Sequence, residues 1–112
     1  MKDITQIAKT CHAVHRAYCK QMGIETQPVW DEVSESHKDV IINSVLKILS
    51  GEINSKEESH FNFVMNKEAQ GWKFGIYSKE NKTNPRLLPF EELRIEDQVK
   101  ETLFFETVKS FI

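Results

Sequence analysis

The chain has 112 residues, which is enough for one domain to bury about two-thirds of its unfolded surface without metal or disulfide support. Its formal net charge of -2 argues against a nucleic-acid-binding protein, because such proteins gather Lys and Arg on a basic domain. It contains neither a run of about 18 apolar residues nor an apolar signal segment, so we expect no contact with a membrane and a cytoplasmic location.

The first predicted helix covers residues 4–22. Its apolar residues recur at spacings of three and four, as an amphipathic helix requires. They are Ile4, Ile7, Ala8, Cys11, Val14, Tyr18 and Met22. Asp3 is the expected N-cap, with Gln6 three residues later, and Gly23 is the expected end.

Two cysteines lie in this predicted helix. Cys11 and Cys19 are eight residues apart, which separates their Cα atoms by about 12 Å along a helix. That distance is too long for a disulfide between them. Two free thiols indicate a reducing compartment.

A loop and a second helix follow. Residues 24–33 have no periodicity, and we expect a loop whose Trp30 packs against a neighbouring helix. Ser34 is the expected N-cap of a helix that ends at Ser50-Gly51. Its predicted inner face consists of Ile41, Val45, Ile48 and Leu49.

The third predicted helix begins at a capping box made by Ser55 and Glu58 and ends at Gly71. Its apolar residues lie on one side at helical spacing, and we expect that side to face the core. They are Phe61, Val64, Met65 and Ala69.

Beyond Gly71 the pattern changes from helix to strand. Aromatic and apolar residues alternate with others over 72–77, which predicts a short strand, and 78–85 is a polar loop. Residues 86–88 are a candidate return strand, and Pro89 suits the first position of a one-turn helix. The inner face of a final helix is predicted to hold Val99, Leu103, Phe104, Val108 and Phe111.

These elements predict a mainly α fold with no internal repeat in the sequence. It has four main helices, with a short β-hairpin-like segment and a polar loop between helices three and four. We expect residues 1–112 to form one domain.

A particular order of glycines, aromatic residues, cations and prolines occupies residues 71–93. It comprises Gly71-Trp72, Phe74-Gly75, Asn84-Pro85-Arg86, Leu88-Pro89-Phe90 and Leu93. This segment resembles the Ryr domain, the repeat found in ryanodine receptors and as a free-standing module in bacterial and phage proteins. Further matches in the same order are Ala8, His12, Tyr18, Trp30, Ser59-His60 and Lys67. The resemblance implies the helical fold described above and a binding role without catalysis.

Aromatic and cationic residues suggest where a ligand would bind. The candidate site residues are Trp72, Arg86, Trp30, Tyr77 and Lys82. Aromatic faces stack on flat ligands, contributing about 1–3 kcal/mol per base in nucleic-acid systems, and cations bind phosphate. The resemblance implies a nucleotide-derived small molecule. The alternative is that the aromatic residues pack a small hairpin and the cations keep a loop soluble.

Catalysis and metal binding are less favoured by the sequence. His12, His15 and Cys19 share one helical face, but structural zinc sites usually draw ligands from more than one element. Cys11 lies on the apolar side of its helix, where a thiol is inert. For His60 we expect a hydrogen bond to loop backbone. We therefore expect no catalytic residues, no metal and no cofactor.

Self-association is the main alternative to ligand binding. Ryr repeats of the receptor pack as pairs, so the resemblance implies a homodimer for a single copy. Phe104 and Phe105 are neighbours in the final helix and diverge by about 100°. We therefore expect one of them to contact a partner, together with Ile112, or a neighbouring segment of the chain. A further alternative is a phage-encoded protein that interacts with a host component.

Overall fold

Four α-helices and two short 3-10 turns form the fold in the computed structural model, which describes residues 3–112. In chain order they are α1 (Ile4–Met22), η1 (Trp30–Glu32), α2 (Glu35–Leu49), α3 (Lys56–Ala69), η2 (Phe90–Glu92) and α4 (Ile95–Lys109). The mainly α prediction with four helices is therefore confirmed. None of the helices described is long and apolar enough to cross a membrane.

The helix ends follow local sequence signals. The Asp3 side chain accepts a hydrogen bond from the Gln6 backbone N–H at 3.3 Å, and Gly23 closes α1 in the left-handed region at φ 70°. Ser34 caps α2 by accepting from the His37 N–H. These caps use only side chains within four residues of the end, so the sequence predicts them well.

The capping box of α3 differs slightly from the prediction. Ser55 Oγ accepts from the Glu58 N–H at 3.1 Å, as expected. The Glu58 carboxylate accepts in return from the N–H of Asn54 at 2.9 Å, one residue before the cap. Two backbone N–H groups at the start of α3 are thus satisfied.

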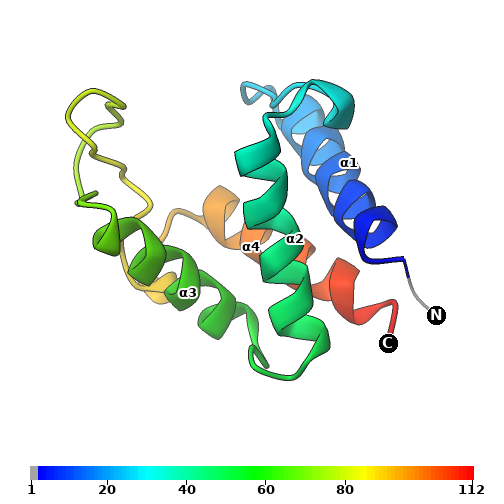
Figure 1. Ribbon diagram of the computed structural model, residues 1–112. Helices are drawn as coiled ribbons and strands as arrows, with labels where there is room; N and C mark the ends of the chain where they lie inside the picture. Colours follow the sequence, from blue (N-terminus) through cyan, green and yellow to red (C-terminus); the bar gives the residue numbers. More distant parts are fainter. Residues whose placement is uncertain (1–2) are drawn as a thin grey trace.

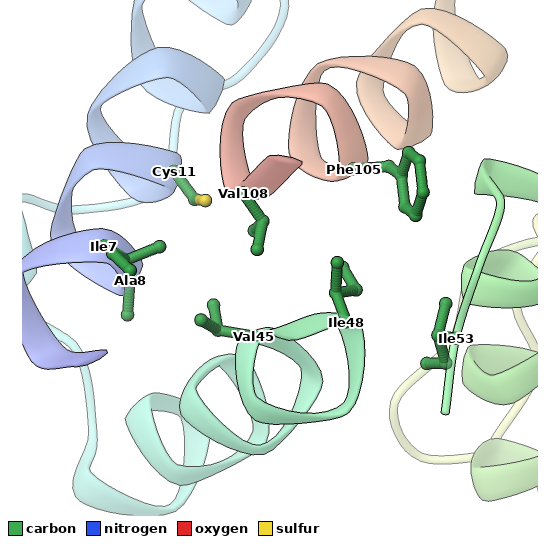
Figure 2. Close-up of a cluster of buried hydrophobic side chains, with 8 residues drawn as sticks. All are labelled: Ile7, Ala8, Cys11, Val45, Ile48, Ile53, Phe105 and Val108. Atoms are coloured by element: carbon green, nitrogen blue, oxygen red, sulfur yellow. The ribbon is translucent and has the colours of Figure 1, made fainter. Parts of the chain in front are cut away.

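Helix α4 is the central element. It packs on α1, α2 and α3, while α1 and α3 lie on opposite sides of the molecule with α2 and α4 between them (Figure 1). The main core lies where α1, α2 and α4 meet, and Figure 2 shows its apolar side chains converging from these helices. It consists of Ile7, Ala8, Cys11, Val45, Ile48, Ile53, Phe105 and Val108.

The structure contains a repeat that the sequence did not reveal. A helix, a 3-10 turn and a second helix occur twice, and η2 and α4 lie 60 residues after η1 and α2. His12 Nε2 lies 2.7 Å from the carbonyl oxygen of Pro28, and His60 Nε2 lies 2.8 Å from that of Leu88. Each carbonyl lies two residues before the 3-10 turn of its unit.

An aromatic residue completes each unit. Trp30 meets His12 edge to face, and Phe90 meets His60 in the same way, both with ring planes at 68°. The prediction of no internal repeat was wrong at the level of structure. The two units share few residue identities, and their loops differ in length, which hides the relation in the sequence.

The predicted hairpin after Gly71 is absent from the described residues. The segment is a closed loop in which Ser78 and Thr83 exchange two backbone hydrogen bonds at 3.0 Å, and Lys73 bonds backbone groups of Lys82 and Asn84. Ile76, at the tip, is 91% exposed. Phe74 and Tyr77 are exposed as well, and an isolated two-stranded hairpin is only marginally stable in water, which explains the lack of a strand.

Helix α3 presents the opposite face from the one predicted. Ser59 and His60 are buried, whereas Phe61 and Met65 are 65% and 47% exposed. The expected inward side was therefore wrong. The cause is the neighbour of this helix, because α3 packs on α4 and η2, where the buried His60 ring hydrogen-bonds the Leu88 carbonyl and its Nδ1 lies 3.4 Å from Glu101 Oε2.

Both neighbouring phenylalanines of α4 contact this chain's own core. Phe105 is buried in the core, and Phe104 packs against the same core from a half-buried position. Both can be covered because α4 has helices on several sides. Ile112 remains exposed.

Candidate functional site

A partly open cavity of about 190 Å³ lies between α1, α2 and α4. Its walls combine three histidines with two cations and an apolar surface. The histidines are His12, His15 and His37, the cations are Arg86 and Lys100, and the apolar residues include Cys11, Ile41, Leu103 and Phe104. Most of these side chains come from α1, α2 and α4, which are far apart in sequence, and Arg86 comes from the loop before η2.

The surroundings of His15 lower its pKa from 6.5 to about 4. Burial is the main cause, and the positive charges of Lys100 and Arg86 add to it. His12 also lowers the pKa of His15, whereas the negative charge of Glu101 raises it. The imidazole is therefore neutral at pH 7 and lies in a net positive field.

His37 has a lowered pKa as well, mainly because of burial and then because of His12 and Lys67. A neutral imidazole has one N–H donor and one nitrogen acceptor. The cavity thus offers uncharged hydrogen-bonding groups next to its cations.

Arg86 is held in place by its neighbours. Its Nη2 donates to Glu101 Oε1 at 3.1 Å, its guanidinium carbon lies 4.7 Å from the centre of the Phe63 ring, and its backbone N–H donates to the Asn84 side chain at 2.8 Å. Glu101 Oε2 also lies 3.4 Å from His60 Nδ1. The Nε atom of Arg86 is buried and has no hydrogen-bond partner in residues 3–112, so this cation keeps an unused donor.

Lys100 is the second cation of the cavity. Its Nζ lies 3.6 Å from Oδ1 of Asp97, which is buried and also pairs with Arg94 at 3.3 Å. An ammonium group has three donors, and the pair with Asp97 uses at most one of them. Lys100 can therefore bind a further anion from the same position.

Three of the predicted site residues lie together in the loop after α3. The rings of Trp72 and Tyr77 are 6.2 Å apart, and Lys67 Nζ lies 5.0 Å from the centre of the Trp72 ring. Lys82 donates from Nζ to the carbonyl oxygen of Gln70 at 2.9 Å. This group lies on the loop and lines neither the cavity nor the core.

The other two predicted residues lie elsewhere. Trp30 is half-buried against the core, edge-on to His12 and with Lys38 Nζ 5.5 Å from its ring centre. Arg86 stacks on Phe63 rather than on Trp72 and lines the cavity. The structure therefore divides the five candidates among three places, and only Arg86 lies in a cavity wall.

Sequence reasoning missed Lys100 and His37 as site residues. Neither has a neighbouring motif, and they join Arg86 only because α2 and α4 pack side by side. His15 was noted as a metal candidate, yet its Nε2 lies 3.6 Å from Cys19 Sγ. Within residues 3–112 no group of three or more His, Cys, Asp or Glu side chains is arranged to hold a metal ion.

No protein-family model matches the sequence, and no curated protein sequence is similar to it. The arrangement of the cavity is therefore the basis for a functional proposal.

Proposed function

We propose that the chain is a non-catalytic, Ryr-like module that binds a small anionic ligand, nucleotide-derived or otherwise aromatic, in the cavity between α1, α2 and α4. The motif over residues 71–93 supports the family assignment. The observation that carries the binding role is the convergence of Arg86 and Lys100 with the uncharged His15 and His37 in a largely apolar hollow.

The chemistry of the walls matches a flat anion. Hydrogen bonds from Lys100 and Arg86 to a phosphate or carboxylate are charge-assisted and hence stronger than neutral ones. Leu103 and Phe104 offer apolar surface for a ring. His15, neutral at pH 7, adds a donor and an acceptor that fix the orientation of the ligand.

The size of the cavity narrows the ligand class. Its volume of about 190 Å³ is below the roughly 300–1,000 Å³ of typical small-molecule sites. A compact aromatic carboxylate fits inside, whereas a nucleotide would place one end inside and leave the remainder at the open mouth.

The state of Cys11 supports a role without catalysis. Burial raises the pKa of this thiol to about 12, and its Sγ lies 4.0 Å from the carbonyl oxygen of Phe104. A thiol in this state is not a nucleophile at neutral pH. The other cavity side chains provide no alternative pairing of a nucleophile with a base.

Calorimetric titration tests the proposal with AMP, cyclic AMP, ADP-ribose and benzoate. We expect at least one of them to bind, and Lys100→Gln to weaken its binding by about tenfold or more, since a charge-assisted hydrogen bond contributes about 1.5–3 kcal/mol. The control is Lys109→Gln, which removes an exposed cation from the same helix and should leave binding unchanged.

The variant Trp72→Ala distinguishes a ligand site in the cavity from a ligand site on the loop after α3. The proposal requires this variant to bind like the unmodified chain, because Trp72 does not line the cavity. Loss of binding in Trp72→Ala with normal binding in Lys100→Gln would place the ligand on the loop. That result, or no binding by any compound, contradicts the proposal.

A further inference from the structure

A second hollow, of about 340 Å³, lies between α3 and residues 87–91. Its floor is apolar and includes the exposed side chains Phe61 and Met65. Carboxylates border it at Glu57, Glu68 and Glu91, while one ammonium, Lys56, lies 5.7 Å from the Phe90 ring at the same place. We call this surface the α3 groove. It is an apolar surface with an excess of negative charge.

The outer face of α1 has the opposite character. Ala13 and Ala17 are exposed and lie one helical turn apart, so they form a flat strip. Lys9 and Lys20 are exposed one turn before and about one turn after this strip. The helix Ile4–Met22 contains no Asp or Glu, so the charges on its outer face are all positive.

The two faces occupy equivalent positions in the structural repeat. His12 of α1 corresponds to His60 of α3, because each bonds the carbonyl that precedes a 3-10 turn. Counting from these histidines relates Lys9 to Glu57, Ala13 to Phe61, Ala17 to Met65 and Lys20 to Glu68. The same positions thus carry lysine and alanine in α1 but glutamate and large apolar residues in α3.

This correspondence makes the faces complementary in shape and in charge. If the two helices pack antiparallel, Lys9 meets Glu68 and Lys20 meets Glu57. An ion pair then forms at each end of the contact. Between these pairs the large side chains of α3 lie on the alanine strip, where small residues allow close approach of two helices.

We propose that the α3 groove of one molecule binds the outer face of α1 of a second molecule. The two faces belong to helices on opposite sides of the molecule (Figure 1), so both remain accessible at once. An interface between two different faces is heterologous, and repetition adds molecules head to tail. The contact is small compared with the roughly 1,200–2,000 Å² of stable complexes, so the association should be weak and visible only at high concentration.

Sedimentation velocity from about 10 µM to about 1 mM protein at low salt tests the proposal. The unmodified chain should form species larger than the monomer as concentration rises. The groove variant Glu57→Lys/Glu68→Lys and the face variant Lys9→Glu/Lys20→Glu should each associate at least tenfold more weakly, because like charges then meet at both ends of the contact.

Mixing the two variants gives the decisive result. In the mixture, the cationic α1 of the groove variant can bind the acidic groove of the face variant. The cationic groove of the groove variant can likewise bind the acidic α1 of the face variant. Association should return to the level of the unmodified chain. A chain carrying all four substitutions should self-associate as well, since both of its faces have exchanged sign.

The matched control is Glu106→Lys/Lys109→Glu, which exchanges two exposed charges on α4 and should leave association unchanged. Circular dichroism melting of every variant verifies folding. A monomeric unmodified chain at all concentrations overturns the proposal. So does association that depends on the groove charges but not on Lys9 and Lys20, because another segment or another protein is then the occupant of the groove.

Discussion

A single histidine shows how surroundings set the charge of one side chain. His15 lies beside Lys100 and Arg86 in the cavity wall and has a pKa of about 4. Protonation of this ring is unfavourable, because it places a positive charge away from water and beside two cations. It is therefore neutral under ordinary conditions, and its protonation is coupled to folding.

We predict that His15 makes the protein less stable in acid. The folded pKa of about 4 is below the unfolded value of 6.5, so the unfolded chain binds more protons between these values. The contribution of the neutral ring is complete above pH 6.5 and is lost as the pH falls through 4. Urea unfolding between pH 7 and pH 4 measures this slope.

The variant for comparison is His15→Gln, which keeps a polar side chain but does not titrate. Its free energy of unfolding should fall less steeply with decreasing pH than that of the unmodified chain. Equal slopes for the two proteins would contradict the lowered pKa of His15.

At the scale of elements, the repeated unit depends on one hydrogen bond in each copy. His12 and His60 reach from the first helix of a unit to the carbonyl before its 3-10 turn. A carbonyl acceptor requires Nε2 to carry the proton, so each histidine donates. This bond fixes the point at which a loop returns to the helix pair.

We predict that His60→Ala lowers the free energy of unfolding by about 2–5 kcal/mol, because it removes a buried ring and the donor to Leu88. His60→Gln should lose about 1 kcal/mol less, since its amide can donate from a similar position. Urea unfolding compares the variants. Equal losses would show that the ring volume alone matters.

The α3 helix and the loop after it show the limit of periodicity. The pattern of Phe61 and Met65 defines an apolar side correctly, but periodicity does not state what covers that side. The alternation over residues 72–77 likewise indicates an extended segment and leaves open whether a pairing strand exists. In both cases the neighbour determined the outcome.

For the whole molecule, the central position of α4 determines which side chains matter for stability. Phe105 extends from α4 into the core, and Phe61 lies on the exposed face of α3. We predict a loss of about 3–5 kcal/mol for Phe105→Ala. Phe61→Ala should change stability by no more than about 0.5 kcal/mol.

Thermal or urea unfolding of both variants measures this difference. Comparable losses for Phe61→Ala and Phe105→Ala would contradict the burial described for α3 and α4. A loss confined to Phe61→Ala would restore the inward face that periodicity predicts for α3.

The helix boundaries could be predicted from the sequence because their signals are local. Asp3, Ser34 and Ser55 cap their helices, and Gly23 ends α1, through contacts a few residues long. The candidate site was predicted poorly for the opposite reason. Of its cations only Arg86 was identified, because Lys100 reaches the cavity through the packing of α4 and carries no motif.

By itself the sequence determined the mainly helical character of the fold, the ends of its helices and most of the apolar positions at its centre. The tertiary structure alone decided the repeat of two units, the outward face of α3, the absence of a hairpin from residues 71–88 and the residues around the cavity. Caps and periodicity act within one or two turns of chain. The burial of a side chain and the electrostatic field around it depend on segments that are distant in sequence and become neighbours only after packing.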